Sequence, residues 1–142
     1  FNRITQNRAK GKNTFIIIDE IYLLFQHEYS ANFLFTLWKR VRKYGAFCTG
    51  ITQNVDDLLQ SHTARTMLAN SEFIVMLNQA STDRIELAKL LNISDLQLSY
   101  ITNVDAGNGL IKVGSSLVPF TDQFPRNTKL YRLMTTKPCE QA

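Results

Sequence analysis

The chain has 142 residues, enough for one domain with a hydrophobic core, and its 44% hydrophobic and 20% charged residues are ordinary for a globular protein. No apolar run approaches the ~20 residues that a membrane-spanning helix needs, and the first residues show no secretory signal pattern. The net charge is +4, and Cys48 and Cys139 give no sign of a disulfide framework or a zinc site, which fits a reducing cytosol.

The chain begins with Phe1 and a polar, basic stretch in which no secondary-structure element is evident. We therefore expect a fragment of a longer polypeptide. Basic residues gather in this stretch and again further along, as Arg3, Arg8, Lys10 and Lys12 and as Lys39, Arg40, Arg42 and Lys43. Such clusters can contact the phosphates of a nucleotide, of DNA or of lipid. For the first cluster, a solvated basic face is the preferred interpretation.

The next stretch, Thr14–Glu20, predicts a buried strand that ends in two acids. Four consecutive large apolar residues, three of them β-branched, favour a central strand of a parallel sheet that is covered on both faces. Asp19 and Glu20 follow at the strand end where open α/β sheets bind ligands. A site that hydrolyses a nucleotide needs such a pair, one acid to hold Mg²⁺ and one to activate water. The alternative is a strand that runs into an acidic, solvated turn.

A phosphate-binding loop is missing from the sequence. Gly11-Lys12-Asn13-Thr14 is similar to the end of such a loop, but position 6 is Gln where the pattern needs glycine. The pattern also needs a helix after the loop, whereas a strand is predicted here. No other stretch supplies a loop of this kind.

A strand–helix–strand unit follows from the periodicity. Ile21–Phe25 predicts a turn or short helix packed under the site, and Ser30 or Asn32 is the expected cap of the next helix. Apolar residues recur at helical spacing from Phe33 to Tyr44, and Gly45 ends the helix. Ala46–Thr52 is the second strand and leads to Gln53-Asn54. A right-handed crossover would place Asp19, Glu20 and Gln53 at the same edge of a parallel sheet.

The remaining elements are predicted from caps, turns and short apolar runs. In order, they are helices over Val55–Leu59 and Thr63–Ala69, a third strand over Glu72–Leu77, a helix that Thr82 or Asp83 caps and that reaches Leu91, a short helix that Ser94-Asp95 caps and that reaches Tyr100, a hairpin of Gly109–Val113 and Leu117–Phe120, and a last strand or extended arm over Lys129–Met134. We expect residues 1–142 to form a single domain.

An ordered set of motifs resembles the C-terminal part of the ATPase domain of conjugative type IV secretion traffic ATPases, the VirB-four class, within the HerA/FtsK group of RecA-like motors. The motifs are Phe15–Glu20 as the Walker B element, Arg42-Lys43-Tyr44-Gly45, Ile51-Thr52-Gln53-Asn54, Asn70-Ser71, Gly107-Asn108-Gly109-Leu110, Val118-Pro119-Phe120 and Tyr131-Arg132-Leu133. The resemblance covers most of the chain from residue 13 onward. It implies an α/β fold: a partial RecA-like P-loop NTPase sheet of parallel strands with flanking helices, plus a C-terminal β-hairpin.

The resemblance also implies roles for individual residues. Asp19 would hold Mg²⁺ through its water shell, and Glu20 would polarise the water that attacks ATP. Gln53 would contact the γ-phosphate or the attacking water, because an amide both donates and accepts hydrogen bonds. Arg42 would be the arginine finger that reaches a neighbouring subunit, with Arg40 in reserve. On simpler interpretations, Gln53 is a cap or turn residue and Arg42 a solvated charge beside the negative end of a helix dipole.

The function that the resemblance implies is ATP hydrolysis to power conjugative export of DNA or protein. The full protein would assemble as a homo-oligomer, a hexamer by analogy, with other type IV secretion components and DNA as partners, in the cytoplasm at the inner face of the cell membrane. Because the phosphate-binding loop is missing, we expect the fragment alone to bind ATP weakly and not to hydrolyse it. Two alternatives stay open: a coupling protein or DNA translocase, and a non-catalytic oligomerisation module. If further strands of the sheet are also absent, the truncated sheet would expose an apolar edge, and self-association through that edge or its covering by other elements is expected.

Overall fold

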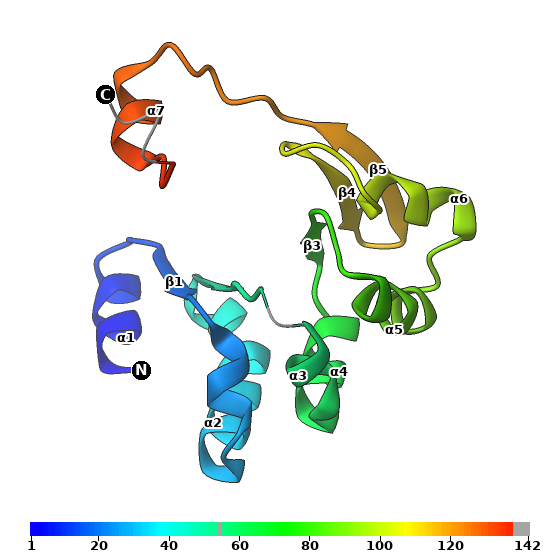
Figure 1. Cartoon of the computed structure of the whole chain (residues 1–142). Coiled ribbons are helices and arrows are strands. Elements are labelled where there is room, and N and C mark those ends of the chain that lie inside the picture. Colours follow the sequence, from blue (N-terminus) through cyan, green and yellow to red (C-terminus); the bar gives the residue numbers. More distant parts are fainter. Residues whose placement is uncertain (54, 138–142) are drawn as a thin grey trace. The chain divides into compact units, whose positions relative to one another are not determined.

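Two compact units make up the chain in the computed structural model, which describes residues 1–53 and 55–137 (Figure 1). The first unit contains residues 1–71 and 85–92, and the second contains residues 72–84 and the chain from 93 onward. No helix in the described ranges combines the length and the apolar character that crossing a bilayer requires.

The first unit is built on a pair of parallel strands. Its elements are α1 (Asn2–Ala9), β1 (Thr14–Ile18), the 3₁₀ turn η1 (Ile21–Phe25), α2 (Glu28–Arg40), the 3₁₀ turn η2 (Val41–Tyr44), β2 (Ala46–Gly50), α3 (Val55–Gln60), α4 (His62–Ala69) and most of α5 (Ser81–Leu91). β1 and β2 pair in parallel, from Thr14 beside Ala46 to Ile18 beside Gly50. This confirms the predicted strand–helix–strand unit and the predicted end of the helical stretch at Gly45.

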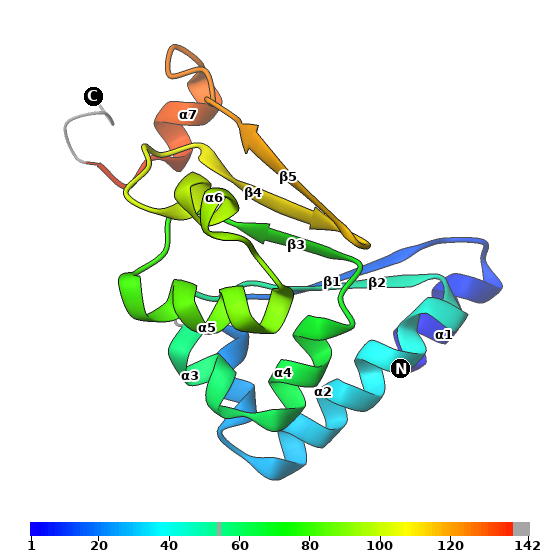
Figure 2. The same ribbon diagram turned by 90° about the vertical axis from the view of Figure 1, so that its right-hand side faces the viewer.

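Helices α2, α3 and α4 lie on one side of the two strands (Figure 2). The core forms between them and consists of Ile4, Ile21, Leu34, Leu37, Val41, Ala46, Leu58, Ala64 and Met67, against which Ile16, Ile18 and Cys48 pack. The alternate residues of the strands point away from this core, because successive strand side chains face opposite sides.

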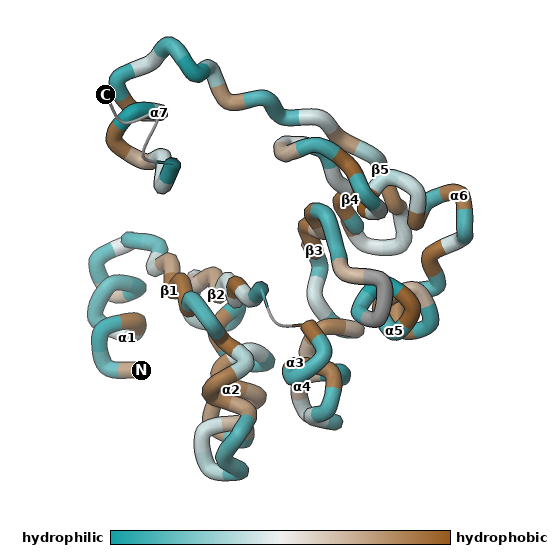
Figure 3. Tube along the Cα trace, in the orientation of Figure 1, coloured by the Kyte–Doolittle hydropathy of each residue, from teal (hydrophilic) through white to brown (hydrophobic). Residues whose placement is uncertain are grey.

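The prediction that β1 is covered on both faces is wrong for this chain. Phe15 and Ile17 are 71% and 70% exposed, and Phe47 on β2 is 53% exposed. These hydrophobic residues belong to the apolar stretches drawn in brown in Figure 3. Within the first unit, the described elements cover only the face that carries Ile16 and Ile18.

Helix starts differ from the sequence predictions in two places. α1 was not expected, since its sequence is polar and only Ile4 is buried. Its position is fixed by packing of Ile4 and by the Asn7 side chain, which donates to Thr14 Oγ1 at 2.9 Å. α2 begins at Glu28, before both expected caps, and the Ser30 hydroxyl lies in its first turn and donates to the His27 carbonyl at 3.0 Å.

The second unit contains an antiparallel sheet with the strand order β3-β4-β5. Its elements are β3 (Phe73–Met76), α6 (Asp95–Leu98), the 3₁₀ turn η3 (Ser99–Ile101), β4 (Asn108–Val113), β5 (Ser116–Thr121) and α7 (Lys129–Met134). The hairpin and the capped helix are confirmed, because the Ser94 side chain accepts from the Gln97 N–H and the Gln97 side chain accepts in return from the Ser94 N–H. β3 extends the sheet of the hairpin by pairing with β4.

The last described element is a helix, so the predicted last strand or extended arm over Lys129–Met134 is wrong. The Thr128 hydroxyl accepts a hydrogen bond from the Tyr131 N–H at 3.1 Å and so caps the first turn. α5 begins at Ser81, so that Asp83 lies in its first turn rather than at its cap. The side chain of Thr82, the other expected cap, lies outside the described residues, as do Asn54 and Cys139.

Candidate functional site

Asp19 and Glu20 follow β1 at the carboxyl edge of the parallel pair, where the chain turns into η1. Two backbone hydrogen bonds fix this turn to the continuation of β2. The Ile51 N–H donates to the Ile18 carbonyl at 2.8 Å, and the Ile21 N–H donates to the Ile51 carbonyl at 3.0 Å. Ile51 therefore holds the two residues that flank the acid pair, Ile18 and Ile21.

Glu20 has a left-handed backbone, with φ 48° and ψ 46°. For a residue other than glycine, this conformation costs roughly 1 kcal/mol. The cost is offset locally, because the Glu20 N–H donates to Asp19 Oδ1 at 3.0 Å and the next residue, Ile21, is buried in the core. Asp19 is exposed and Glu20 is half-buried, so both carboxylates remain accessible from one sharp turn.

Gly50 allows η1 to lie close to the end of β2. A Cβ atom at this position would be 2.6 Å from Ile21 Cδ1 and 3.3 Å from Ile21 Cγ2. Such distances are too short for carbon atoms, so a side chain at position 50 would displace Ile21 or force a change of its rotamer. Ile21 directly follows Glu20. Gly50 is therefore a positioning residue for the turn that carries Asp19 and Glu20, which we call the acid turn.

Gln53 lies at the same edge of the sheet as the two acids. It follows Gly50, the last residue of β2, by three positions, and Gly50 is paired with Ile18 at the end of β1. The side chain of Gln53 is exposed. The structure thus places Asp19, Glu20 and Gln53 at one edge, as expected from a parallel crossover.

Arg42 lies at the opposite end of the strands. It belongs to η2, which directly precedes Gly45 and β2, whereas the acid turn follows the far end of β1. A strand of five residues spans roughly 16 Å, and this length separates the two ends. Arg42 therefore cannot join Asp19 and Glu20 in a site made by one copy of the chain.

The two candidate arginines differ in their surroundings. The Arg40 guanidinium lies 5.6 Å from the centre of the Phe1 ring, a cation–π contact. The Arg42 side chain is exposed and makes no hydrogen bond or ion pair with residues 1–53 or 55–137. Of the two, Arg42 is available to an external group.

The acid turn suits a magnesium ion only when a ligand completes the coordination. Within the described part of the chain, no group of three or more His, Cys, Asp or Glu side chains lies close enough to hold a metal. Mg²⁺ is commonly held by one or two carboxylates together with substrate phosphates and waters. The oxygen ligands of Asp19 and Glu20 fit that type of site.

A polar hollow of about 310 Å³ lies beside the turn, between η1 and the segment that joins α3 to α4. It is lined by Tyr22, Phe25, Gln26, Asp57, Gln60 and Ser61. The lining contains no cationic side chain, so the hollow lacks the groups that bind phosphate.

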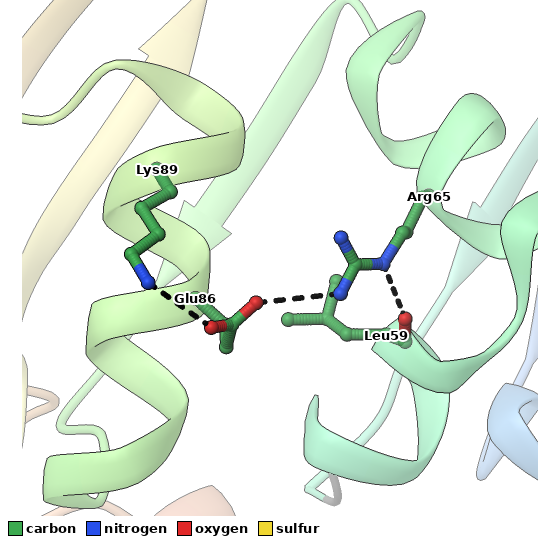
Figure 4. Close-up of polar contacts among 4 residues, drawn as sticks. All are labelled: Leu59, Arg65, Glu86 and Lys89. Atoms are coloured by element: carbon green, nitrogen blue, oxygen red, sulfur yellow. Dashed lines mark hydrogen bonds and ion pairs between the residues drawn. The ribbon is translucent and has the colours of Figure 1, made fainter.

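Arg65 organises contacts that the sequence analysis missed (Figure 4). It donates from Nε to the Leu59 carbonyl and from a terminal nitrogen to Glu86 at 3.3 Å. Lys89 forms a second ion pair with Glu86 at 3.5 Å. These contacts connect α3 and α4 with the part of α5 that belongs to the first unit. The spacing of Glu86 and Lys89 is a sequence signal for their ion pair, but nothing in the sequence points to Arg65.

Cys48 is a packing residue rather than a nucleophile. It lies on β2 opposite Ile16, and its side chain packs against the core. Burial raises the pKa of the Cys48 thiol to about 11, so the thiol is protonated at neutral pH.

The chain is similar to known proteins both in sequence and in structure. Residues 4–132 match the family model of the TraG P-loop domain. Among solved structures, VirB4 of Thermoanaerobacter pseudethanolicus is similar to this chain, with a TM-score of 0.77 and 24% identity over 99% of the chain. The chain spans 35% of the length of that VirB4 chain. The search of curated proteins found no match.

Proposed function

The chain belongs to the family of TraG P-loop domains, and from this we propose that it supplies the metal-binding and sensor residues of an ATPase that powers conjugative type IV secretion. The family match and the VirB4-like fold confirm the resemblance that the motifs indicated, and the α/β fold agrees with a partial P-loop NTPase. The observation that carries the proposal is the Asp19–Glu20 turn, held by Ile51 at the carboxyl edge of two parallel strands. Ligands bind at this edge in open α/β sheets.

Asp19 and Glu20 have separate tasks in the proposed reaction. Asp19, exposed at the end of β1, would hold Mg²⁺ through water, and the ion would supply positive charge to offset the negative charge of ATP. Glu20 accepts a hydrogen bond from the attacking water and draws its proton. The left-handed backbone of Glu20 sets the direction in which its side chain leaves the main chain.

Gln53 is the proposed sensor of the γ-phosphate. Its exposed amide lies at the same edge as the acid turn and can donate to a phosphate oxygen or accept from the attacking water. Hydrolysis and phosphate release change which of these bonds are available. The segment after β2, which leads into α3, would therefore respond to the state of the nucleotide.

Arg42 is the proposed arginine finger, and it acts on a neighbouring copy. Its position at the opposite end of the strands supports action between subunits, and its lack of a partner among the described residues leaves the guanidinium available. The arginine would offset the charge that develops on the transferred phosphoryl group. This role requires an oligomer, for which we propose a homohexamer at the cytoplasmic face of the membrane, associated with other secretion components.

The chain alone should bind ATP weakly and should not hydrolyse it, because its sequence contains no phosphate-binding loop. We therefore test activity in a full-length protein that contains this sequence. Replacing Glu20 by Gln removes the base and should lower kcat by about 100-fold or more, while ATP binding is kept. Glu28→Gln is the matched control, since Glu28 is an exposed carboxylate in the first turn of α2. Equal activity of the Glu20→Gln protein and the wild type would contradict the proposal.

Mixed oligomers test the action of Arg42 between subunits. Full-length Glu20→Gln and Arg42→Ala proteins are expected to be inactive when each is assembled alone. Mixing them before assembly creates interfaces in which one copy supplies Glu20 and its neighbour supplies Arg42. Partial recovery of ATP hydrolysis is the expected result, and no recovery would show that Arg42 does not act on a neighbour.

A further inference from the structure

The Arg65 side chain bonds to two other elements of the first unit, although Arg65 itself lies in α4 (Figure 4). Its Nε donates to the carbonyl of Leu59 in α3, and a terminal nitrogen donates to the Glu86 carboxylate in α5 at 3.3 Å. A planar guanidinium presents its N–H groups in a fixed fork, so the two acceptors are held at a set separation from each other. Arg65 therefore joins the end of α3 to α5.

Helix α4 gives Arg65 a firm attachment to the core. Ala64, which precedes Arg65, is 1% exposed, and Met67 belongs to the same core. The Ser61 side chain caps the helix by accepting from the Ala64 N–H at 3.3 Å, and the Arg65 N–H donates to the Ser61 carbonyl at 3.0 Å. The main chain of Arg65 is therefore fixed, and its side chain can hold a neighbouring element in place.

Helix α3 has only six residues and needs contacts beyond its own hydrogen bonds. The last four carbonyls of a helix have no partner inside the helix. Here the Leu58 carbonyl accepts from the Ser61 N–H at 3.3 Å, and the Leu59 carbonyl accepts from Arg65. Leu58 and Leu59 are buried, but apolar packing is non-directional and does not fix how a helix slides along its axis. The directional bond from Arg65 fixes that position.

Gln53 is two residues before the first residue of α3. Because a link of two residues reaches at most about 7 Å, the position of α3 limits where the Gln53 amide lies. Arg65 bonds to the opposite end of α3, and a helix of six residues is about 9 Å long. Arg65 can therefore act on Gln53 through the helix that lies between them.

We propose that Arg65 is a positioning residue for Gln53. By bonding to Leu59 and Glu86 together, it holds α3 in the position from which the Gln53 amide reaches the γ-phosphate. The catalytic consequence rests on the proposed function, in which Gln53 is the sensor. Arg65 and Glu86 are 45% and 40% exposed, and ion pairs at such positions contribute little to stability. Loss of the Arg65 contacts should therefore change the position of α3 and leave the chain folded.

Lys89 offers a matched control. It pairs with the same Glu86 carboxylate at 3.5 Å from within α5. Lys89→Gln therefore removes one ion pair and one positive charge, as Arg65→Gln does, but leaves the bond to Leu59 in place. Thermal unfolding checks that each variant is folded.

The first measurement uses the 142-residue chain and does not depend on ATP hydrolysis. Amide hydrogen exchange in α3 should be roughly 2- to 10-fold faster in Arg65→Gln than in the parent chain, as expected for the loss of one hydrogen bond. Lys89→Gln should exchange like the parent chain. Equal exchange of α3 in Arg65→Gln and the parent chain, or equal acceleration in both variants, would overturn the proposal.

The second measurement uses the full-length protein. Arg65→Gln should lower kcat roughly tenfold with a nearly unchanged KM for ATP, because a misplaced amide slows the chemical step without removing a phosphate-binding group. Arg65→Lys keeps the charge but not the fork and should recover part of the loss, and Lys89→Gln should keep the kcat of the parent protein. In a Gln53→Ala background, Arg65→Gln should cause no further loss, since Arg65 acts through Gln53.

The outcomes separate this proposal from the proposed function. If Gln53→Ala lowers kcat but Arg65→Gln does not, or if the two losses multiply in the double variant, Gln53 is the sensor and the role of Arg65 is overturned. If Gln53→Ala keeps the kcat of the parent protein, the sensor role of Gln53 is wrong. Faster exchange of α3 in Arg65→Gln would then still support the placement of this helix by Arg65.

Discussion

At the residue scale, Glu20 combines two demands that are usually met by different amino acids. A left-handed backbone favours glycine or asparagine, whereas activation of water needs a carboxylate. The chain keeps the carboxylate and offsets the conformational cost with the bonds of Ile51 and the burial of Ile21. Under the proposed ATPase function, the turn that carries Asp19 and Glu20 would give up local stability for chemistry.

Two amides at position 20 measure this conformational cost directly. Both Glu20→Asn and Glu20→Gln lack the carboxylate, but only Asn tolerates the left-handed conformation well. We expect the Asn variant to have a free energy of unfolding about 0.5–1 kcal/mol higher than the Gln variant. Urea unfolding of the two variants under identical conditions checks this difference. Equal stabilities would mean that the turn is not strained in solution.

Cys48 gives a prediction that depends on pH. Its thiol has a pKa of about 11 in the folded chain, above the ordinary value of 9.0, because burial disfavours the thiolate. The resulting contribution to stability is complete below pH 9.0 and is lost as the pH rises towards about 11. At pH 8, iodoacetamide should modify Cys48 roughly 100-fold more slowly in the folded chain than in urea. Mass spectrometry of the Cys48 peptide gives both rates, and similar rates would show that the thiol is not buried.

At the scale of single elements, the hairpin of the second unit depends on a close approach at Gly109. A Cβ atom there would be 2.4 Å from the Met76 carbonyl oxygen and 2.7 Å from the Phe120 ring. Because a backbone atom and a packed ring cannot both move away, the contact of β4 with β3 and β5 requires glycine. This gives a structural reason for the Gly107-Asn108-Gly109 motif.

Replacing Gly109 by Ala should therefore destabilise the sheet β3-β4-β5. Overpacking of this kind costs about 1–3 kcal/mol, and we expect the upper end because Met76 contributes a backbone atom. Amide hydrogen exchange at β4 and β5 should become faster in this variant. Ser115→Ala, in the exposed turn of the same hairpin, is the control and should leave the exchange unchanged. Unaltered protection in Gly109→Ala would disprove the close approach.

Elements with a clear apolar period could be predicted from the sequence, and elements fixed by a few distant contacts could not. β1, β2 and the long helix α2 each carry an apolar face that packs against one core. α1 has a polar sequence and depends on Ile4 and on contacts with segments up to 35 residues away. α7 depends on the single cap of Thr128, in a stretch whose composition also suits a strand.

The same distinction applies to the candidate site. Asp19, Glu20 and Gln53 could be placed at one edge, because parallel pairing follows from the strand–helix–strand order. The left-handed Glu20 and the closeness of Gly50 to Ile21 could not be predicted, because they result from how η1 packs on β2. The contact of Arg8 with Lys43, which joins the two basic clusters of the sequence, likewise could not be predicted.

At the scale of the whole molecule, the exposed face of β1 and β2 is the main departure from an ordinary globular surface. Phe15 and Phe47 are stacked with ring centres 5.1 Å apart, yet both are more than half exposed, and Ile17 lies next to them in the sheet. Contiguous apolar surface of this kind promotes association in water. The strand face is therefore the part of the described chain where association is expected.

The chain alone should accordingly associate with itself as its concentration rises. Phe15→Thr/Phe47→Thr should reduce this association, measured by sedimentation velocity, while threonine maintains the preference for strand structure. The loss of the ring pair should cost only about 0.2–1 kcal/mol. Tyr29→Thr/Leu133→Thr changes residues that are 87% and 71% exposed outside the strands and is the control. The same association in both variants would show that the strand face is not responsible.

The hydrogen bonds of Ile51 have a consequence for sequence variation. The residue contributes only its N–H and carbonyl to the acid turn, so nearly any amino acid except proline can serve at position 51. Deleting or inserting one residue within β2 would disrupt the acid turn, because a different peptide group would then lie opposite Ile18 and Ile21. We therefore expect the length of this segment to be fixed and its side chain at position 51 to vary. The contribution of Ile51 to the Ile51-Thr52-Gln53-Asn54 motif would then rest on its spacing from β1 rather than on its side chain.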